Sequence, residues 1–353
     1  MRFPIIRALA AAILVHLCVP HRAGAEIKSL KIDGTKILVN GKPTRLWGVR
    51  VAGAAGSEQY TAQLLESLEY YRSKGINALV VYYQGSSGQT WRVFSPDGRT
   101  FADAGIRDRM RRIIASAAAA DMVVIVGLFV PRKMGVDSED PRLESRQAYI
   151  EAARTAAAEL KSFNNVIVSV AHDAGRAAWS TSPFRCAPED AIECLRAIAA
   201  VADIPRGCGG EEHVFNEAVA SSDAATVIIH HERTPAPPKF TAARPAINVC
   251  MLGRDSGGRG NPQGVWSLPE REKFFQMLDK YLASDRDHLC AHFQGWHEGG
   301  MDLRKNLFTV GGMGTLKDPG TAWFFEALDR RLRPPAARHP SGPPTTGKTI
   351  FDF

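Results

Sequence analysis

The chain has 353 residues, 45% of them hydrophobic, and a formal net charge of +7. This allows one large domain with a substantial core, and an α/β barrel of about 250 residues would leave little room for a second. Without residues 1–25 the chain holds 41 basic and 37 acidic residues, a net charge of +4. The sequence shows no concentrated basic face of the kind that binds nucleic acid.

The N-terminus has the features of a secretory signal peptide. Arg2 and Arg7 precede a mostly apolar run at 8–19, and Ala23-Gly24-Ala25 is a small-residue cleavage site. The run is short for a bilayer span, although an uncleaved anchor is the alternative. We expect cleavage after residue 25, export to the periplasm or the extracellular space, and no stable membrane insertion afterwards. The mature domain would cover 26–333, and the Pro-rich, polar residues 334–353 would be a disordered tail.

From residue 27 onward, short apolar strands alternate with amphipathic helices. Residues 27–48 are typical of a β-hairpin leading into a strand, with turns at Ile32–Thr35 and Val39–Pro43. Eight strands of the main body are predicted, at 45–51, 76–83, 122–130, 165–171, 204–208, 226–231, 246–252 and 288–296. Helices are predicted at 59–74, around 110–117, and at 142–163, 189–202, 211–220, 269–282 and 322–332.

This alternation predicts parallel βαβ units and favours a (β/α)8 TIM barrel with an N-terminal β-hairpin. A doubly wound open sheet is the alternative. Its Gly-rich phosphate-binding fingerprint is missing after the first strand, because Gly53 to Gly56 does not supply it.

One of the six cysteines lies in the predicted signal peptide, so an odd number remains. Cys186, Cys194 and Cys208 cluster in one segment, and two of them are candidates for a disulfide if the protein is exported. Cys250 and Cys290 lie on strands that we expect to be neighbours. Small buried hydrophobic residues are the alternative for all five, and none has the spacing of a metal site.

The fourth predicted strand ends in the most informative stretch. Asn165 to Ala171 is rich in β-branched residues, as in a strand buried on both faces, and His172-Asp173 follow at once. In an α/β barrel the reactive side chains sit at the carboxyl ends of the strands. Asp173 is therefore the first candidate for catalysis, with a helix-capping Asp as the alternative.

Several ordered landmarks resemble the clan A (β/α)8 glycoside hydrolases, most closely the cellulase-type family 5. They are Asn-Gly-Lys-Pro at 40–43, Leu-Trp-Gly-Val-Arg at 46–50, Lys-Gly-Ile-Asn-Ala-Leu at 74–79, His230 at the end of strand six and Trp296 at the end of strand eight. The resemblance covers about residues 30–330. It implies a barrel with a sugar-binding cleft and hydrolysis by two carboxyl groups.

The chain departs from this family at the catalytic positions. The family ends strand four with Asn-Glu, the Glu being its general acid/base, whereas this chain has His172-Asp173. At the position of the nucleophilic Glu on strand seven it has Met251 or Cys250, depending on the anchor residue, and the family's strand-two Arg aligns with Val80 or its neighbour. The resemblance therefore implies an altered carboxyl pair.

Glycoside cleavage needs a second carboxyl beside Asp173, and Glu298 after strand eight is our first choice. Glu232 and Asp255 are the alternatives. A separation wider than the roughly 5 Å of a retaining site would indicate an inverting mechanism. The residues predicted to bind substrate are His172, His230, His231, Trp296, Tyr82, Trp179 and Arg50.

Histidines and acids at the strand ends could also resemble a metal site, but no compact ligand signature is present. We therefore predict neither metal nor cofactor. Three functions remain: an exported hydrolase of O-glycosidic bonds in a poly- or oligosaccharide, an inactive glycan-binding barrel that has lost the strand-seven nucleophile, or a hydrolase of another chemistry. We favour the first, with a carbohydrate as the partner and the oligomeric state undetermined.

Overall fold

The computed structural model describes residues 26–85, 89–133, 138–232, 236–251, 268–291 and 319–332. Its main feature is a sheet of eight parallel strands, joined in the order β8-β7-β6-β5-β4-β11-β10-β9. A further bridge between Gly210 and His230 links the β8 side of the sheet to β9, so the sheet is nearly closed into a barrel. The strands are β4 (Trp47–Arg50), β5 (Ala78–Tyr82), β6 (Val123–Phe129), β7 (Val166–Ala171), β8 (Arg206–Gly207), β9 (Ile228–His230), β10 (Ala246–Met251) and β11 (Asp287–Ala291).

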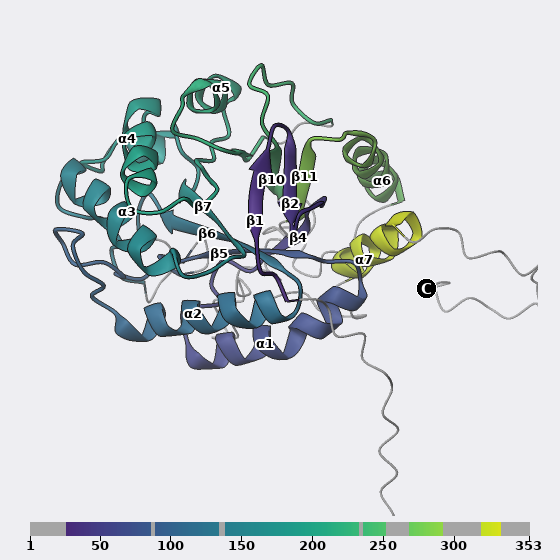
Figure 1. Cartoon of the computed structure of the whole chain (residues 1–353), viewed down its shortest axis with the longest axis horizontal. Coiled ribbons are helices and arrows are strands. Elements are labelled where there is room, and N and C mark those ends of the chain that lie inside the picture. The colour runs from purple at the N-terminus through teal and green to yellow at the C-terminus, as the bar shows by residue number, and fades with distance from the viewer. Residues whose placement is uncertain are drawn as a thin grey trace, which may run out of the picture.

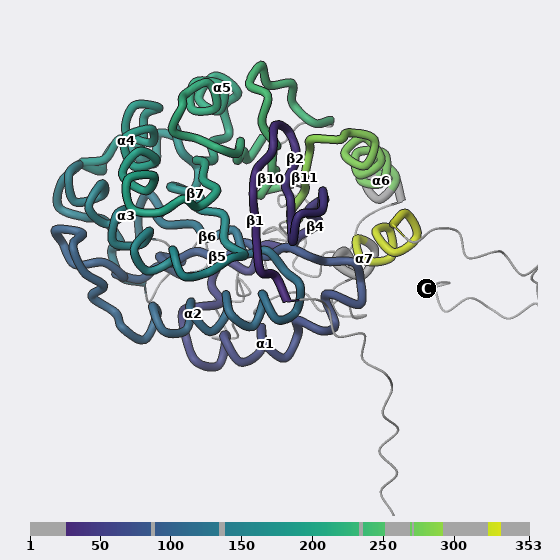
Figure 2. Tube along the Cα trace, in the orientation of Figure 1, coloured from purple at the N-terminus to yellow at the C-terminus, as the bar shows by residue number. Residues whose placement is uncertain are grey.

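Helices surround the barrel (Figure 1). The Cα trace shows α1 and α2 along one side, α3 and α4 along another, and α6 beside β11, with α7 next to α6 (Figure 2). The helices within the described ranges are α1 (Glu58–Ser73), α2 (Ala104–Ala119), α3 (Arg146–Leu160), α4 (Pro188–Ala199), α5 (His213–Ser221), α6 (Leu268–Ala283) and α7 (Pro319–Leu332), with a short 3-10 helix η1 (Ala177–Trp179) after β7.

Side-chain caps decide where several helices begin. The Ser57 side chain accepts a hydrogen bond from the Tyr60 amide at the start of α1. At α3 the Ser145 side chain accepts one from the Ala148 amide. The predicted helix at 142–163 therefore starts later, at Arg146. The predicted helix at 211–220 also starts later, at His213, which leaves Glu211 in the loop after β8.

The core has two layers, because alternate strand residues face opposite sides of the sheet. On β5, Val80 belongs to the cluster inside the barrel, whereas Leu79 and Val81 pack under the helices. Ile37 and Val39 of the N-terminal sheet join the interior cluster. That sheet, β1 (Leu30–Asp33), β2 (Lys36–Val39) and β3 (Lys42–Pro43), is antiparallel, and β1 and β2 lie across the barrel strands in the view of Figure 1.

The predicted (β/α)8 barrel with its N-terminal hairpin is confirmed. All eight predicted strands are present in the predicted order, with boundaries shifted by a few residues. The predicted signal peptide at 1–25 and the predicted tail at 334–353 lie outside the described residues, so the domain boundaries stay predictions. Among the described helices, none combines the length and apolar character that a bilayer crossing requires.

Candidate active site

A cluster of polar side chains occupies the carboxyl ends of the barrel strands. We define the Asp173 cluster as Arg50, His172, Asp173, Arg176 and His231. These residues come from the ends of β4, β7 and β9, because parallel strands bring their carboxyl ends to one rim of the barrel. Four of the five, all but Arg176, were predicted from the sequence as site residues.

Asp173 lies at the centre of this cluster. Its Oδ1 is 3.1 Å from Nδ1 of His231, and its Oδ2 is 2.9 Å from Nη1 of Arg176 and 3.4 Å from Nε2 of His172. The side chain is 17% exposed, so it keeps a small contact with solvent while most of it is enclosed. The carboxylate therefore contacts three side chains and still keeps a small surface in contact with solvent.

The backbone places Asp173 by an unusual conformation. Its φ is +51°, in the left-handed region that Asp tolerates better than most residues. The Trp179 indole N–H lies 3.1 Å from the carbonyl oxygens of both His172 and Asp173 and donates to them. Trp179 is fully buried, so it supports this turn, and its ring is not exposed for the substrate binding that we predicted.

The charges of the cluster keep Asp173 ionised. Burial by itself would raise the pKa of Asp173. The positive charges of His172, His231 and Arg50, with the hydrogen bond from His231, outweigh burial and hold the pKa well below its usual range. At neutral pH this group is therefore a carboxylate, able to act as a base, a nucleophile or a stabiliser of positive charge, and not as a proton donor.

Arg50 and Tyr82 form the inner wall of the site. Arg50 is fully buried, its Nη2 is 3.2 Å from Nε2 of His172, and its guanidinium carbon lies 5.1 Å from the Tyr82 ring centre. The Tyr82 hydroxyl is 3.5 Å from Nδ1 of His172. Both predicted binding residues therefore contact His172, although the full burial of Tyr82 makes it a supporting residue in this structure.

Cys250 lies at an irregularity in β10 and contacts Arg50. The register of β10 against β11 shifts between Asn248 and Met251, as at a β-bulge. Within it the Cys250 amide donates to Oδ1 of Asn248, and Cys250 Sγ lies 3.9 Å from Nη1 of Arg50. A thiol thus stands at this strand end, where the resembled family has a carboxylate.

Arg176 links Asp173 to a second carboxylate that sequence reasoning missed. Its Nε lies 3.2 Å from Oε2 of Glu211, while its Nη1 contacts Asp173. Glu211 directly follows Gly210, which pairs with Ala174, so the two acids stand at neighbouring strand ends. The sequence placed Glu211 at the start of the predicted helix 211–220, whereas α5 begins at His213, and this assignment hid its relation to Asp173.

Two other predicted residues point elsewhere. Glu232 is buried and accepts a hydrogen bond from Nδ2 of Asn216 on α5, with Nδ1 of His213 at 3.2 Å. His230 lies on the opposite face of β9 from His231 and packs edge-on against Phe240. Burial lowers the pKa of His230 to about 3, so this ring is neutral. The structure does not bring Glu232 or His230 into the Asp173 cluster.

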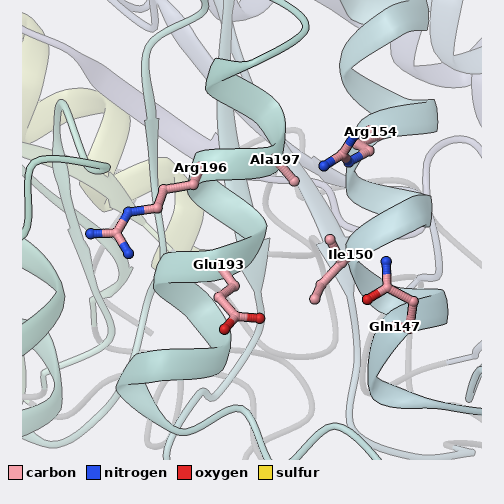
Figure 3. Close-up of a pocket in the computed structure, with 6 residues that line it drawn as sticks. All are labelled: Gln147, Ile150, Arg154, Glu193, Arg196 and Ala197. Atoms are coloured by element: carbon pink, nitrogen blue, oxygen red, sulfur yellow. The ribbon is translucent and has the colours of Figure 1, made fainter.

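The remaining candidates fall in other parts of the chain. Glu298, Trp296 and Asp255 lie outside the described residues, and the side chain of Met251 does too. A hollow of about 300 Å³ in the described part lies on the outer surface between α3 and α4 (Figure 3), away from the Asp173 cluster. Its lining residues are Gln147, Ile150, Arg154, Glu193, Arg196 and Ala197.

His172, Asp173 and His231 also offer ligand atoms within 4.8 Å of one another. Two imidazoles and a carboxylate suit zinc or a similar ion. However, the guanidinium of Arg50 contacts His172 and that of Arg176 contacts Asp173, and these positive charges oppose a cation at the same donors. The donor set therefore fits hydrogen bonding to a neutral polar ligand better than metal binding.

Comparisons with known proteins agree with the barrel. No protein-family model matches the sequence, and no curated protein matches it significantly. A glycoside hydrolase family 5 structure from Bacteroides vulgatus is similar with a TM-score of 0.56 and 15% identity, over 83% of this chain and 69% of that one. An endo-1,4-beta-mannanase from Eisenia fetida gives 0.55 and 13% over 85% and 94%, and a family 5 mannosidase from Rhizomucor miehei gives 0.55 and 10% over 86% and 99%. At these identities the likeness establishes the fold that the resemblance implied.

Proposed function

We propose that this protein is a glycoside hydrolase that acts on O-glycosidic bonds of a poly- or oligosaccharide. The observation that carries the proposal is an ionised, largely buried Asp173 at the carboxyl ends of the strands of a (β/α)8 barrel. The names of similar structures, which include a mannanase and a mannosidase, support this class of substrate.

Asp173 supplies the ionised member of the carboxyl pair. Glycoside hydrolysis needs one carboxylate and one protonated carboxyl on either side of the bond. The low pKa of Asp173 suits the carboxylate, which activates water or stabilises the positive charge that develops on the sugar. The proton donor is then a different residue, which reverses the acid/base role that the resemblance gave to this strand.

Two residues compete for the role of proton donor. Glu298 remains the first choice from the sequence, because it follows the last barrel strand. Glu211 is the alternative from the structure, since it shares Arg176 with Asp173. Replacing each acid separately by Gln distinguishes them: the proton donor's variant loses activity on ordinary glycosides but keeps it on aryl glycosides whose leaving group needs no proton.

The test is turnover on a panel of mannans, glucans and xylans, measured as released reducing ends. We expect Asp173→Asn to lower kcat by at least about 100-fold, within the range for a group that acts in proton transfer. Asp108→Asn, which removes an exposed carboxylate of α2, is the matched control and should keep full activity. Equal activity of the Asp173 variant and the wild type on a hydrolysed glycan would refute the catalytic role.

A glycan-binding barrel without hydrolysis is the second candidate. It is favoured by Cys250 and Met251 at the end of β10, where the resembled family carries its nucleophile. Saturable binding on a glycan array, with no product after prolonged incubation, would select this function. Export after cleavage at residue 25 is part of both proposals, and N-terminal sequencing of the mature protein tests it.

A further inference from the structure

Three buried cysteines lie beside the turn that carries Asp173. Cys186 precedes α4, Cys194 lies within α4, and Cys208 follows β8. All three are free thiols in the same hydrophobic cluster, and none is more than 2% exposed. The proposed hydrolysis uses none of them, so their gathering at this place calls for its own explanation.

Two of these cysteines lie next to backbone that holds the turn. The Gly175 amide donates to the carbonyl oxygen of Cys186 at 3.2 Å, and the Ala174 amide donates to that of Gly209 at 3.0 Å. Cys186 and Cys208 therefore flank the turn from two sides, one directly and one through the adjacent residue. Cys186 also has a left-handed φ of +51°, a conformation that costs roughly 1 to 2 kcal/mol in a residue with a Cβ.

The backbone bonds of the turn also bring Cys186 and Cys208 together, because Gly175 bonds to Cys186 and the adjacent Ala174 bonds to Gly209, the residue after Cys208. Cys194 lies within α4 and has no such link to the turn through its own backbone or its neighbour's. Burial raises the pKa of the Cys186 thiol, so it stays protonated and unreactive once the protein is folded. Any oxidation of this pair must therefore take place while the chain folds and the thiols are still accessible.

We propose that Cys186 and Cys208 form a disulfide when the chain folds in an oxidising medium, and that this bond fixes the turn carrying Asp173. The thiolate of one cysteine attacks a small disulfide such as oxidised glutathione, which releases one glutathione thiolate and leaves a mixed disulfide. The second thiolate attacks the protein sulfur of that mixed disulfide and releases the other glutathione. Overall the two protein thiols lose two electrons and two protons, and the oxidant takes up both.

This inference goes beyond the proposed hydrolysis and does not depend on it. It also accounts for the odd number of cysteines after residue 25, since Cys194, Cys250 and Cys290 would remain thiols. A disulfide limits the freedom of the unfolded chain, and a loop of this length in a protein of this size should raise the Tm by roughly 5 °C.

The test folds the full chain from denaturant in a glutathione redox buffer and, separately, in excess reductant. The free thiols of both products are then alkylated under denaturing conditions, and the number of alkylated cysteines is measured by mass spectrometry. Of the six cysteines, we expect four to be alkylated in the oxidised product and all six in the reduced one. Peptide mapping should show one link between Cys186 and Cys208, and hydrogen exchange over residues 172–187 should be slower in the oxidised protein.

Variants separate this pair from the third cysteine. Cys194→Ser should keep the link and the Tm difference between the two products, whereas Cys208→Ser should lose both. Complete alkylation of the wild type after oxidative folding would overturn the proposal, and so would a link that contains Cys194. The mass measurement on the wild type needs no variant, so the proposal can still be refuted if a variant fails to fold.

Discussion

Replacing Asp173 by Asn tests whether charge, and not shape, holds the candidate site together. Asn has nearly the same size and also tolerates a positive φ, so the substitution removes the charge and leaves the backbone of the turn unstrained. The amide oxygen can still accept one hydrogen bond. What is lost is the attraction between a carboxylate and the histidine and arginine side chains around it.

The expected loss in the free energy of unfolding is about 2 kcal/mol at pH 7. Most of this loss comes from the hydrogen bond between Asp173 and the fully buried His231 side chain, because hydrogen bonds to a charged group contribute about 1.5 to 3 kcal/mol. The contact with Arg176 adds less than about 1 kcal/mol, because the Arg176 side chain is 42% exposed and solvent screens it. Asp173→Ala should cost about 1 kcal/mol more than Asn, since Ala is strained at a φ of +51°.

Urea unfolding at pH 7 and pH 3 measures this loss and its pH dependence. A depressed carboxyl pKa stabilises the fold fully above the unfolded value of about 3.9, and this stabilisation is lost as the pH falls through the native value. At pH 3 the difference between wild type and Asp173→Asn should therefore be smaller by about 1 kcal/mol. Burial lowers the pKa of both His230 and His288 to about 3, so both proteins lose stability in acid, and only their difference reports on Asp173.

Two outcomes would refute this reasoning. If the variant were as stable as the wild type at pH 7, the carboxylate would not be held by the surrounding charges. If the loss were the same at pH 7 and pH 3, it would arise from shape or packing, and the depressed pKa of Asp173 would be wrong.

Other parts of the site give further predictions. Gly127→Ala should destabilise the protein by about 2 kcal/mol in urea unfolding, because the new Cβ would lie 2.1 Å from an atom of the Tyr82 ring; unchanged stability would mean that the ring moves freely. Trp179→Phe should lower the free energy of unfolding by about 1 kcal/mol, because the indole hydrogen bond to the backbone of the turn is lost. Hydrogen exchange should speed up more at the amides of residues 172–175 than at other amides. Elemental analysis of protein dialysed against zinc should find less than one ion per chain, since Arg50 and Arg176 compete with a cation for the cluster; one tightly bound ion would contradict that view.

The pattern of the sequence was sufficient to predict the barrel. Alternating residues such as Leu79 and Val80 bury both faces of a strand, and this gives continuous apolar runs that are visible without a structure. Helix boundaries were less certain, because they depend on single side-chain caps such as Ser145. The weak two-residue strand β8 was located in the right place, but the helix after it begins at His213, two residues later than predicted, and Glu211 was therefore wrongly assigned to that helix.

For the candidate site, the sequence predicted Asp173, His172, His231 and Arg50, because titratable residues at the ends of apolar strands are distinctive, and the structure brings these four together. Only the tertiary structure decided their partners and the ionisation of Asp173. The low pKa of Asp173 depends on the charge of its neighbour His172 and on charges brought from β4 and the end of β9, which are far away in sequence. His231 contacts Asp173 and His230 does not, because successive residues at the end of β9 point to opposite faces of the sheet. Arg176 contacts both Asp173 and Glu211 because the loops after β7 and β8 meet at the rim of the barrel. Residue type and strand position are properties of the chain, whereas the pKa and the partner of each group arise from contacts that exist only in the folded protein.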